Sequence, residues 1–318
     1  MNAMTTDTGA GCKSSPRSEW GYVSGRVNVL ETQLLNRSFF EGVLKNRSMA
    51  DARSSLWKTP YRAAFATDEH VRDFHAALDL YAETMVSGIM KISPPHPLKA
   101  FFEIPRRYLA FRTVFLRAAA RSASAAELEE AFDVLTADTF ERTAVASHIG
   151  MLRNREAPQT ADSVARSLFL DSAVCALRLE LANTVEEELV RGLFHDIAML
   201  QCWSAVLRSR WNGTSADIIR RWFVVPERFG DFVRNAAGLA DANPVAPLAG
   251  KVGDHAFQVL RTIGSEQIRR NVDAAIGEAI RENVLQNRMV TYGPERVASY
   301  LIAFHVEQEN LRLSLASI

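Results

Sequence analysis

The residues of this chain best suited to metal chemistry are a few dispersed histidines and aspartates. His195 and Asp196 are adjacent, His148 precedes them and Asp254 follows them. Imidazole and carboxylate groups together suit a divalent transition metal, and a metal held this way can activate water. If the fold brings these four side chains together, they would suit metal-assisted hydrolysis.

The surrounding sequence is only partly similar to an enzyme family of that kind. Phe194-His195-Asp196-Ile197 resembles the core step of the all-helical HD-type metal-dependent phosphohydrolases. However, Asp196 is followed by Ile-Ala-Met in place of the glycine turn and lysine usual in that family. The His-Asp pair also lies inside a continuous apolar segment of helical period. We keep this family as the alternative interpretation.

Other enzyme classes lack their local signatures. The sequence contains no phosphate-binding loop, no dinucleotide fingerprint and no nucleophile elbow. The cysteines Cys12, Cys175 and Cys202 are sparse and far apart, which indicates neither a disulfide framework nor a zinc site. We therefore expect no catalytic residue, cofactor or metal in the main interpretation.

The charge balance and the tryptophans bear on nucleic-acid binding. The formal net charge is zero, and a nucleic-acid partner would favour a dense basic surface. Trp203, Trp211 and Trp222 recur near helical spacing, which favours core or interface anchors over a base-stacking platform. We expect no nucleic-acid partner.

The pattern along the chain predicts an all-α protein. Apolar residues recur at three- and four-residue spacing, and no segment sustains a two-residue alternation. The 318 residues are 47% hydrophobic and 23% charged, which is ordinary for a globular protein with a sizeable core. We expect a disordered leader over residues 1–18 and a helical domain over 19–318, with lobe boundaries near 93–97, 154–160 and 241–247.

Start and stop signals locate several helices. Ser48 and Ser124 each lie three residues before an acidic residue, an arrangement typical of helix N-caps. Thr67 is predicted to cap another helix. Asn212-Gly213 ends a long helix, and Gly293-Pro294 opens the last one. The final 65 or so residues are predicted to form two helices.

A faint internal repeat is present. Two segments share a long helix ending in Leu-Arg, a small polar turn and a new helix. The matched positions lie at a constant offset, and Leu311-Arg312-Leu313 would begin a truncated third copy. A true repeat would imply stacked helical units, and a chance match is the alternative. The pairs are Leu116-Arg117 with Leu207-Arg208, Ser124-Ala125 with Ser215-Ala216, and Leu128 with Ile219.

Both ends of the chain resemble one known family. The closing segment from Tyr292 to Arg312 has a glycine-led turn, a helix and then Glu-Asn-Leu-Arg, similar to the ending of the C/d subunits of archaeal-type (A-type) and vacuolar-type (V-type) rotary ATPases. The first helix and the Leu-x-x-Thr-x-Tyr step from Leu56 to Tyr61 are similar to that family's opening. The middle helix from His195-Asp196 to Leu207-Arg208 resembles an internal element of the family.

The resemblance implies a structural role. Members of that family are three-lobed helical funnels with pseudo-threefold character, and they link the proteolipid ring to the central stalk without catalysing anything. It thus implies a cytoplasmic protein that is peripheral to the membrane and touches it only through partner subunits, which fits the absence of an apolar run of about 18 residues. The motif and interface candidates are Arg26, Tyr61, Arg117, Asp196, Arg208, Glu309, Asn310 and Arg312.

The chain also departs from the family's pattern. Leu200 stands where an internal element usually carries asparagine, and Tyr108 and Arg112 replace an acid and an asparagine in the first copy. His305 stands where the last helix is often acidic. These differences leave any polar network in the middle of the chain an open question, and they suggest a divergent branch.

Overall fold

The computed structural model describes residues 16–66, 73–154, 163–286 and 290–318. Every regular element in these ranges is a helix, and none is a strand, so the all-α prediction is confirmed. The described residues form two compact units: a middle unit from Pro97 to Asn283, and a terminal unit of the residues up to His96 and from Val284 onward. The positions of the two units relative to each other are not fixed, so each is described by itself.

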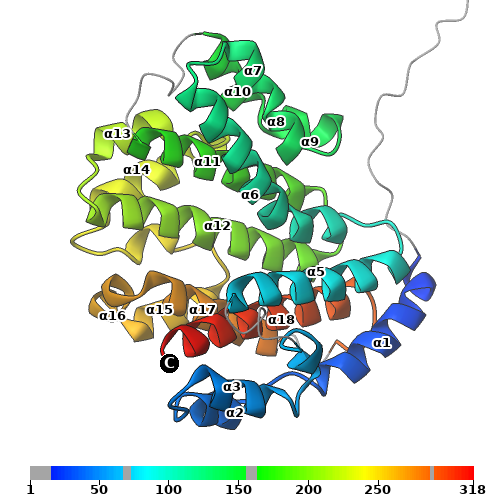
Figure 1. The fold of residues 1–318 in the computed structure, drawn as a ribbon. Coiled ribbons are helices and arrows are strands. Elements are labelled where there is room, and N and C mark those ends of the chain that lie inside the picture. Colours follow the sequence, from blue (N-terminus) through cyan, green and yellow to red (C-terminus); the bar gives the residue numbers. More distant parts are fainter. Residues whose placement is uncertain (1–15, 67–72, 155–162, 287–289) are drawn as a thin grey trace, which may run out of the picture. The chain divides into compact units, whose positions relative to one another are not determined.

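The terminal unit combines the beginning and the end of the chain. Its last helix packs against α1, α2 and α5, which come from the first hundred residues. Figure 1 shows this helix, in red, alongside α5. Its elements are the 3-10 helices η1 (Arg17–Trp20) and η2 (Pro60–Ala63) and the helices α1 (Gly21–Glu31), α2 (Arg37–Val43), α3 (Met49–Leu56), α5 (Phe74–Ile92) and α18 (Pro294–Ala316).

The starts of these helices follow the sequence signals. The Ser48 side chain accepts a hydrogen bond from the Asp51 amide and caps α3, as predicted. Gly293 precedes α18 with φ of +101°, and Pro294 occupies the first turn, where its missing N–H costs nothing. The predicted apolar stripe of this helix is buried: Val297, Leu301, Phe304, Leu311 and Leu315.

The middle unit is built around two long antiparallel helices. Helix α11 (Ser163–Asn183) packs along α12 (Glu188–Trp211), and α6 (Leu98–Ala120) packs on α11. The other elements are α7 (Ala125–Glu130), α8 (Phe132–Leu135), α9 (Thr139–Ala144), α10 (Ala146–Arg153), α13 (Ala216–Trp222), η3 (Glu227–Phe229), α14 (Gly230–Leu239), η4 (Ala246–Leu248), α15 (Asp254–Ile263), α16 (Ser265–Arg270) and α17 (Val272–Gln286), which continues past the unit's last residue, Asn283.

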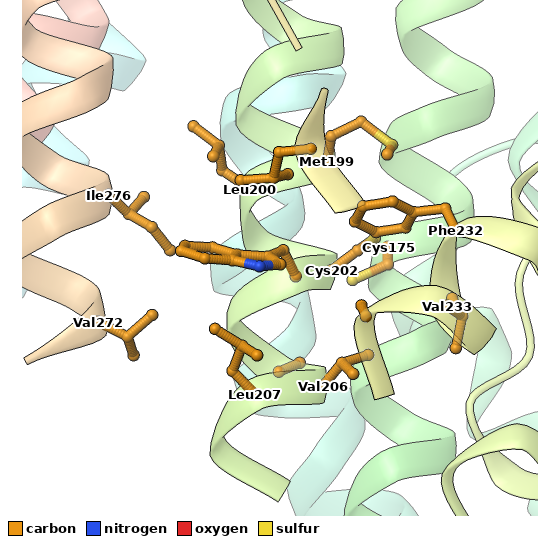
Figure 2. Close-up of a cluster of buried hydrophobic side chains, with 14 of the residues drawn as sticks. Cys175, Met199, Leu200, Cys202, Val206, Leu207, Phe232, Val233, Val272 and Ile276 are labelled. Atoms are coloured by element: carbon orange, nitrogen blue, oxygen red, sulfur yellow. The ribbon is translucent and has the colours of Figure 1, made fainter. Parts of the chain in front are cut away.

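Trp203 lies in a hydrophobic cluster of this unit. Its side chain is fully buried, and its indole N–H donates to the Pro244 carbonyl oxygen at 2.7 Å. Figure 2 shows neighbouring members of the cluster, with Leu200 and Leu207 from α12, and Val272 and Ile276 from α17. Trp222 belongs to the same cluster and Trp211 packs against it, which agrees with the prediction that these aromatics are core anchors.

The repeat seen in the sequence has a counterpart in the backbone. Ser124 caps α7 and Ser215 caps α13, 91 positions later. The positive-φ residue in each preceding turn obeys the same offset, with Ser122 at +53° and Gly213 at +86°. Helices α6 and α12 end 91 residues apart, at Ala120 and Trp211. Two copies of a helix–turn–helix element are therefore present in the middle unit.

Other expectations need correction or stay predictions. The described parts of the final residues, 254–286 and 290–318, form four helices, α15 to α18, not two, because Gly264 at φ of +80° and the extended Asn271 interrupt the helical path. The three-lobed arrangement is not confirmed, and the lobe boundaries stay predictions. Residues 1–15 of the leader and Thr67 lie outside the described residues, whereas η1 includes the leader's last two positions.

Candidate functional site

A buried carboxyl group joins both ends of the chain inside the terminal unit. The Tyr61 hydroxyl on η2 donates to Glu307 Oε1 on α18 at 2.7 Å, and the Leu35 amide donates to Glu307 Oε2. The neighbouring Gln308 amide donates to the Tyr61 hydroxyl oxygen. Glu307 is 6% exposed, and Tyr61 and Gln308 are also buried. We call Tyr61, Glu307 and Gln308 the tyrosine–glutamate cluster.

Burial dominates the electrostatics of this cluster. It raises the pKa of Glu307 to about 7, against the opposing hydrogen bonds from Tyr61 and Leu35. Burial, followed by the Glu307 charge, raises the pKa of Tyr61 above its usual range, so this hydroxyl stays a hydrogen-bond donor. The Tyr81 ring lies 4.8 Å from the Tyr61 ring. The arrangement is suited to holding three segments together.

A second polar group ties α1 to the start of α18. The Arg296 guanidinium donates to Asn28 Oδ1 at 2.6 Å and to both carboxylate oxygens of Glu31, and its side chain is 6% exposed. The Gly293 amide donates to Ser24 Oγ at 3.1 Å. Removing the Glu31 carboxylate is expected to be costly, because the buried Arg296 guanidinium would lose its counter-charge.

The Glu-Asn-Leu-Arg segment near the end of α18 is divided between the surface and the core. Leu311 is fully buried, whereas Glu309 and Asn310 are exposed. Arg312 donates to Asp79 Oδ1 on α5 at 2.6 Å and lies 3.6 Å from Glu309 Oε1. The spacing predicts that Glu307 shares a polar set with Glu309 and Arg312. The structure instead buries Glu307 against Tyr61.

The remaining motif candidates differ in setting. Arg26 is exposed on α1, and its charge lowers the pKa of Tyr300 against a larger rise caused by burial. Arg117 is exposed near the end of α6 in the middle unit. Arg208 lies in the same unit and donates to Asp273 Oδ2 at 3.0 Å, where Ser204 also contacts Asp273.

Asp196 has a buried structural role in the middle unit. It accepts hydrogen bonds from the Gly253 amide at 2.9 Å and from Asn283 Nδ2 at 2.8 Å. Burial raises the pKa of Asp196, and these two hydrogen bonds oppose the rise. A Cβ at position 253 would lie 2.9 Å from Asp196 Oδ2, so a glycine suits this close approach. Asp196 thus fixes the residue that precedes α15.

The positions that depart from the family's pattern form their own contacts. Tyr108 on α6 donates to Asp171 on α11, and Arg112 donates to the Tyr108 hydroxyl oxygen at 3.2 Å. Leu200 is buried in the hydrophobic cluster of the middle unit. The first copy of the repeat therefore has a polar contact between helices, although its residue types differ from the family's.

The structure does not assemble the alternative metal site. His148 is buried with Nε2 at 2.9 Å from Ser172 Oγ, and burial lowers its pKa to about 3. It lines a hollow of about 300 Å³ whose lining includes neither His195, Asp196 nor Asp254. His195 packs on the Phe229 ring. Over the described ranges, no three His, Cys, Asp or Glu side chains are grouped to hold a metal ion.

No family model and no curated protein matches this chain. Among the helices of the described segments, none has both the length and the apolar character to cross a bilayer. The residues themselves and their positions in the fold therefore indicate the function.

Sequence reasoning missed the burial of Glu307 and the pairing of Arg296 with Asn28 and Glu31. One signal was available for Glu307: Phe304, Glu307 and Leu311 fall at i, i+3 and i+7, which is one face of a helix, and that face is otherwise apolar. A glutamate on such a stripe is either at the rim of the core or hydrogen-bonded within it. No comparable signal in the sequence pairs Arg296 with Asn28.

The turn before α18 offers a direct test of how this unit is held together. Replacing Gly293 by alanine is expected to lower the free energy of unfolding by about 1–3 kcal/mol, because φ there is +101°. The new Cβ would also lie 2.6 Å from Glu295 Oε2 and 3.0 Å from Arg17 Nη2, which form an ion pair at this point. Urea unfolding followed by far-UV circular dichroism measures the change.

Gly25 is the matched control for this substitution. It lies within α1 with open space around its Cβ position, so Gly25→Ala is expected to be neutral or to stabilise by up to about 1 kcal/mol. Equal losses for the two variants would contradict the strained turn.

Proposed function

We propose that this chain is the non-catalytic coupling subunit of a rotary ATPase, equivalent to the C/d subunits of archaeal-type and vacuolar-type enzymes. It would link the proteolipid ring to the central stalk at the cytoplasmic face of the membrane. The torque of ATP-driven or ATP-generating transport of protons or sodium ions would pass through this joint. The chain itself would catalyse nothing.

One observation carries the proposal. The residues that resemble the family lie at opposite ends of the sequence, yet they contact each other inside the terminal unit. Tyr61 of the opening segment binds Glu307 of the closing segment, and Glu31 of the first helix binds Arg296 of the last. The resemblance therefore lies on residues that hold one folded unit together, which a chance similarity of two unconnected segments would not be expected to do.

The internal repeat gives further support. Helices α6 and α12 with their caps recur at an offset of 91 residues, and each carries Leu-Arg near its C-terminal end, as α18 does in Leu311-Arg312. A protein made of three such units would have the pseudo-threefold funnel that the family resemblance implies. We therefore include a three-lobed funnel built from three such units in the proposal.

The mechanical demands of the role match the construction of the units. Torque transfer requires stiffness, which close-packed long helices provide. The buried hydrogen bonds of the tyrosine–glutamate cluster and of Arg296 also fix helices that are far apart in sequence. Arg117 and Arg208 lie near helix C-terminal ends, where a cation interacts favourably with the helix dipole.

Affinity isolation from native membranes tests the proposal. The tagged chain is solubilised in mild detergent, and the co-isolated proteins are identified by mass spectrometry, with the untagged strain as background. We expect proteolipid ring and central-stalk subunits. Deleting the chain is expected to abolish ATP-driven ion uptake into membrane vesicles, while the catalytic head retains ATP hydrolysis.

Two results would overturn the proposal. One is recovery of the chain without ring or stalk subunits. The other is unchanged ATP-driven ion uptake after the deletion. Recovery of the chain alone with bound metal and phosphatase activity would favour the HD-type alternative.

A further inference from the structure

One short segment of the terminal unit is strongly basic in an otherwise balanced chain. Residues 37–62 contain six basic residues and two acidic ones, whereas the whole chain has a formal net charge of zero. This segment spans α2, α3 and the start of η2. The basic residues are Arg37, Lys45, Arg47, Arg53, Lys58 and Arg62, and the acidic ones are Glu41 and Asp51.

An exposed tryptophan lies among these cations. The Trp57 side chain follows α3 and is 42% exposed. The Arg62 guanidinium lies 4.7 Å from the centre of its ring, and that of Arg53 lies 5.9 Å away. Arg53 is held there because it donates to the carbonyl oxygens of Phe65 and Ala66 at 3.0 and 2.9 Å. The indole is thus fixed at the surface beside two positive charges.

The segments that carry the other basic residues are held together by local contacts. Asn46, in the loop between α2 and α3, donates to Ser55 on α3 at 3.5 Å. Lys58 lines a hollow of about 290 Å³ together with Phe39 of α2. Leu44, at the end of α2, is 56% exposed next to Lys45. Apolar and basic side chains are therefore interspersed over this part of the unit.

Within the described residues, four of the six cations form no ion pair. Arg37 pairs with Glu41 at 2.8 Å, and Arg53 binds backbone carbonyl oxygens. Lys45, Arg47, Lys58 and Arg62 are exposed, and over the described part of the chain none of them forms an ion pair. These four and Trp57 are called the basic–aromatic surface below.

We propose that the basic–aromatic surface binds the anionic phospholipid headgroups of a membrane. Clustered lysines and arginines are attracted to the negative surface potential of a membrane, and each adds roughly fivefold to the binding constant. A half-exposed indole suits the level of the headgroups, and long basic side chains can extend past apolar surface to reach phosphates. Within the described residues none of the four cations forms an ion pair, so all four charges can interact with a diffuse layer of phosphates.

This inference does not rest on the coupling function. It predicts that the purified chain binds a membrane surface by itself, in addition to any contact made through partner subunits. If the rotary proposal fails, the vesicle result is unaffected, and the reverse also holds.

Co-sedimentation with lipid vesicles tests the inference. The purified full chain is mixed with vesicles of phosphatidylcholine alone or of phosphatidylcholine with phosphatidylglycerol. We expect binding only to the anionic vesicles, and weaker binding as salt shortens the range of the attraction. The combined variant Lys45→Ser, Arg47→Ser, Lys58→Ser and Arg62→Ser is expected to bind at least a hundredfold more weakly, in line with about fivefold per charge.

Four exposed cations of the middle unit provide a control of equal charge. The variant with Lys99, Arg121, Lys251 and Arg261 all changed to serine is expected to bind nearly as the unmodified chain does. Circular dichroism checks that both variants are folded. Trp57→Ala, with all cations kept, is expected to weaken binding severalfold, because the half-exposed indole lies beside the cations at the level of the headgroups.

Two outcomes would overturn the inference. In the first, the two charge variants lose vesicle binding equally, which means that net charge alone acts. In the second, the unmodified chain does not bind anionic vesicles. In this second case, the variant with the four cations of the basic–aromatic surface changed to serine is also tested by affinity isolation from native membranes. If that variant no longer co-isolates partner subunits, the surface binds an acidic protein.

Discussion

Replacing Arg107 by alanine is expected to lower the free energy of unfolding by about 3–5 kcal/mol. Arg107, on α6, donates to Glu141 Oε1 at 3.0 Å and also contacts Oε2. Glu141 is 1% exposed, so the substitution would leave a buried carboxylate without its counter-charge. Arg107 also donates to the Leu135 carbonyl oxygen at 2.8 Å, which joins α6 to the end of α8. Urea unfolding followed by far-UV circular dichroism measures the loss.

Arg117 provides the matched control, because it is an arginine of the same helix but is exposed. Arg117→Ala is expected to change the free energy of unfolding by no more than about 0.5 kcal/mol. The double substitution Arg107→Met with Glu141→Leu removes both charges and is expected to cost less than Arg107→Ala alone. Part of the cost should remain, since the Ala137 amide donates to Glu141 at 2.6 Å and would lose its acceptor. Equal effects of Arg107→Ala and Arg117→Ala would show that the pair is not buried as described.

Local sequence signals predicted the helices well wherever the signal and its effect lie within one turn. The caps at Ser48 and Ser124 and the opening of α18 at Gly293 depend on residues within three or four positions. The prediction failed in the final residues, where Gly264 and Asn271 interrupt a pattern whose apolar spacing continues on both sides. Apolar spacing alone does not distinguish one helix from two that share a buried face.

The candidate site was harder to predict because its contacts span the whole chain. Tyr61 and Glu307 are 246 positions apart, so no local pattern can indicate that the Tyr61 hydroxyl donates a hydrogen bond to the Glu307 carboxylate. The family resemblance named Tyr61, Glu309, Asn310 and Arg312, whereas spacing alone grouped Glu307 with Glu309 and Arg312. The fold separates that set, since only Glu307 of the three faces η2. Which of the polar residues on a helix becomes buried is decided by the elements packed against it.

Glu307 is expected to make the stability of the chain depend on pH in the direction opposite to that of an ordinary salt-bridged acid. Burial raises its pKa from 4.5 to about 7 in the folded state, so the folded chain holds this proton more tightly than the unfolded chain. The contribution to stability is complete below pH 4.5, declines as pH rises and is lost above about pH 7. It amounts to at most about 3 kcal/mol.

Glu307→Gln isolates this contribution because the amide has nearly the same shape and does not titrate. The free energy of unfolding of this variant, relative to that of the unmodified chain, is expected to rise by up to about 3 kcal/mol between pH 4.5 and 7. Burial also raises the pKa values of Asp171 and Asp196, but both proteins carry these groups, so their effect cancels in the difference. Urea unfolding at a series of pH values measures it.

Glu309→Gln is the control, since Glu309 lies two residues away on the same helix and is exposed. Its stability relative to the unmodified chain should vary little over this pH range. The groups that face Glu307 are the Tyr61 hydroxyl on η2, the Leu35 amide ahead of α2, and Tyr81 on α5, with Tyr300 from its own helix. None of these side chains becomes charged below pH 7, so a change in the difference over this range belongs to Glu307. A flat difference would mean that water reaches this carboxylate, and that the two ends of the chain are not joined by a buried hydrogen bond.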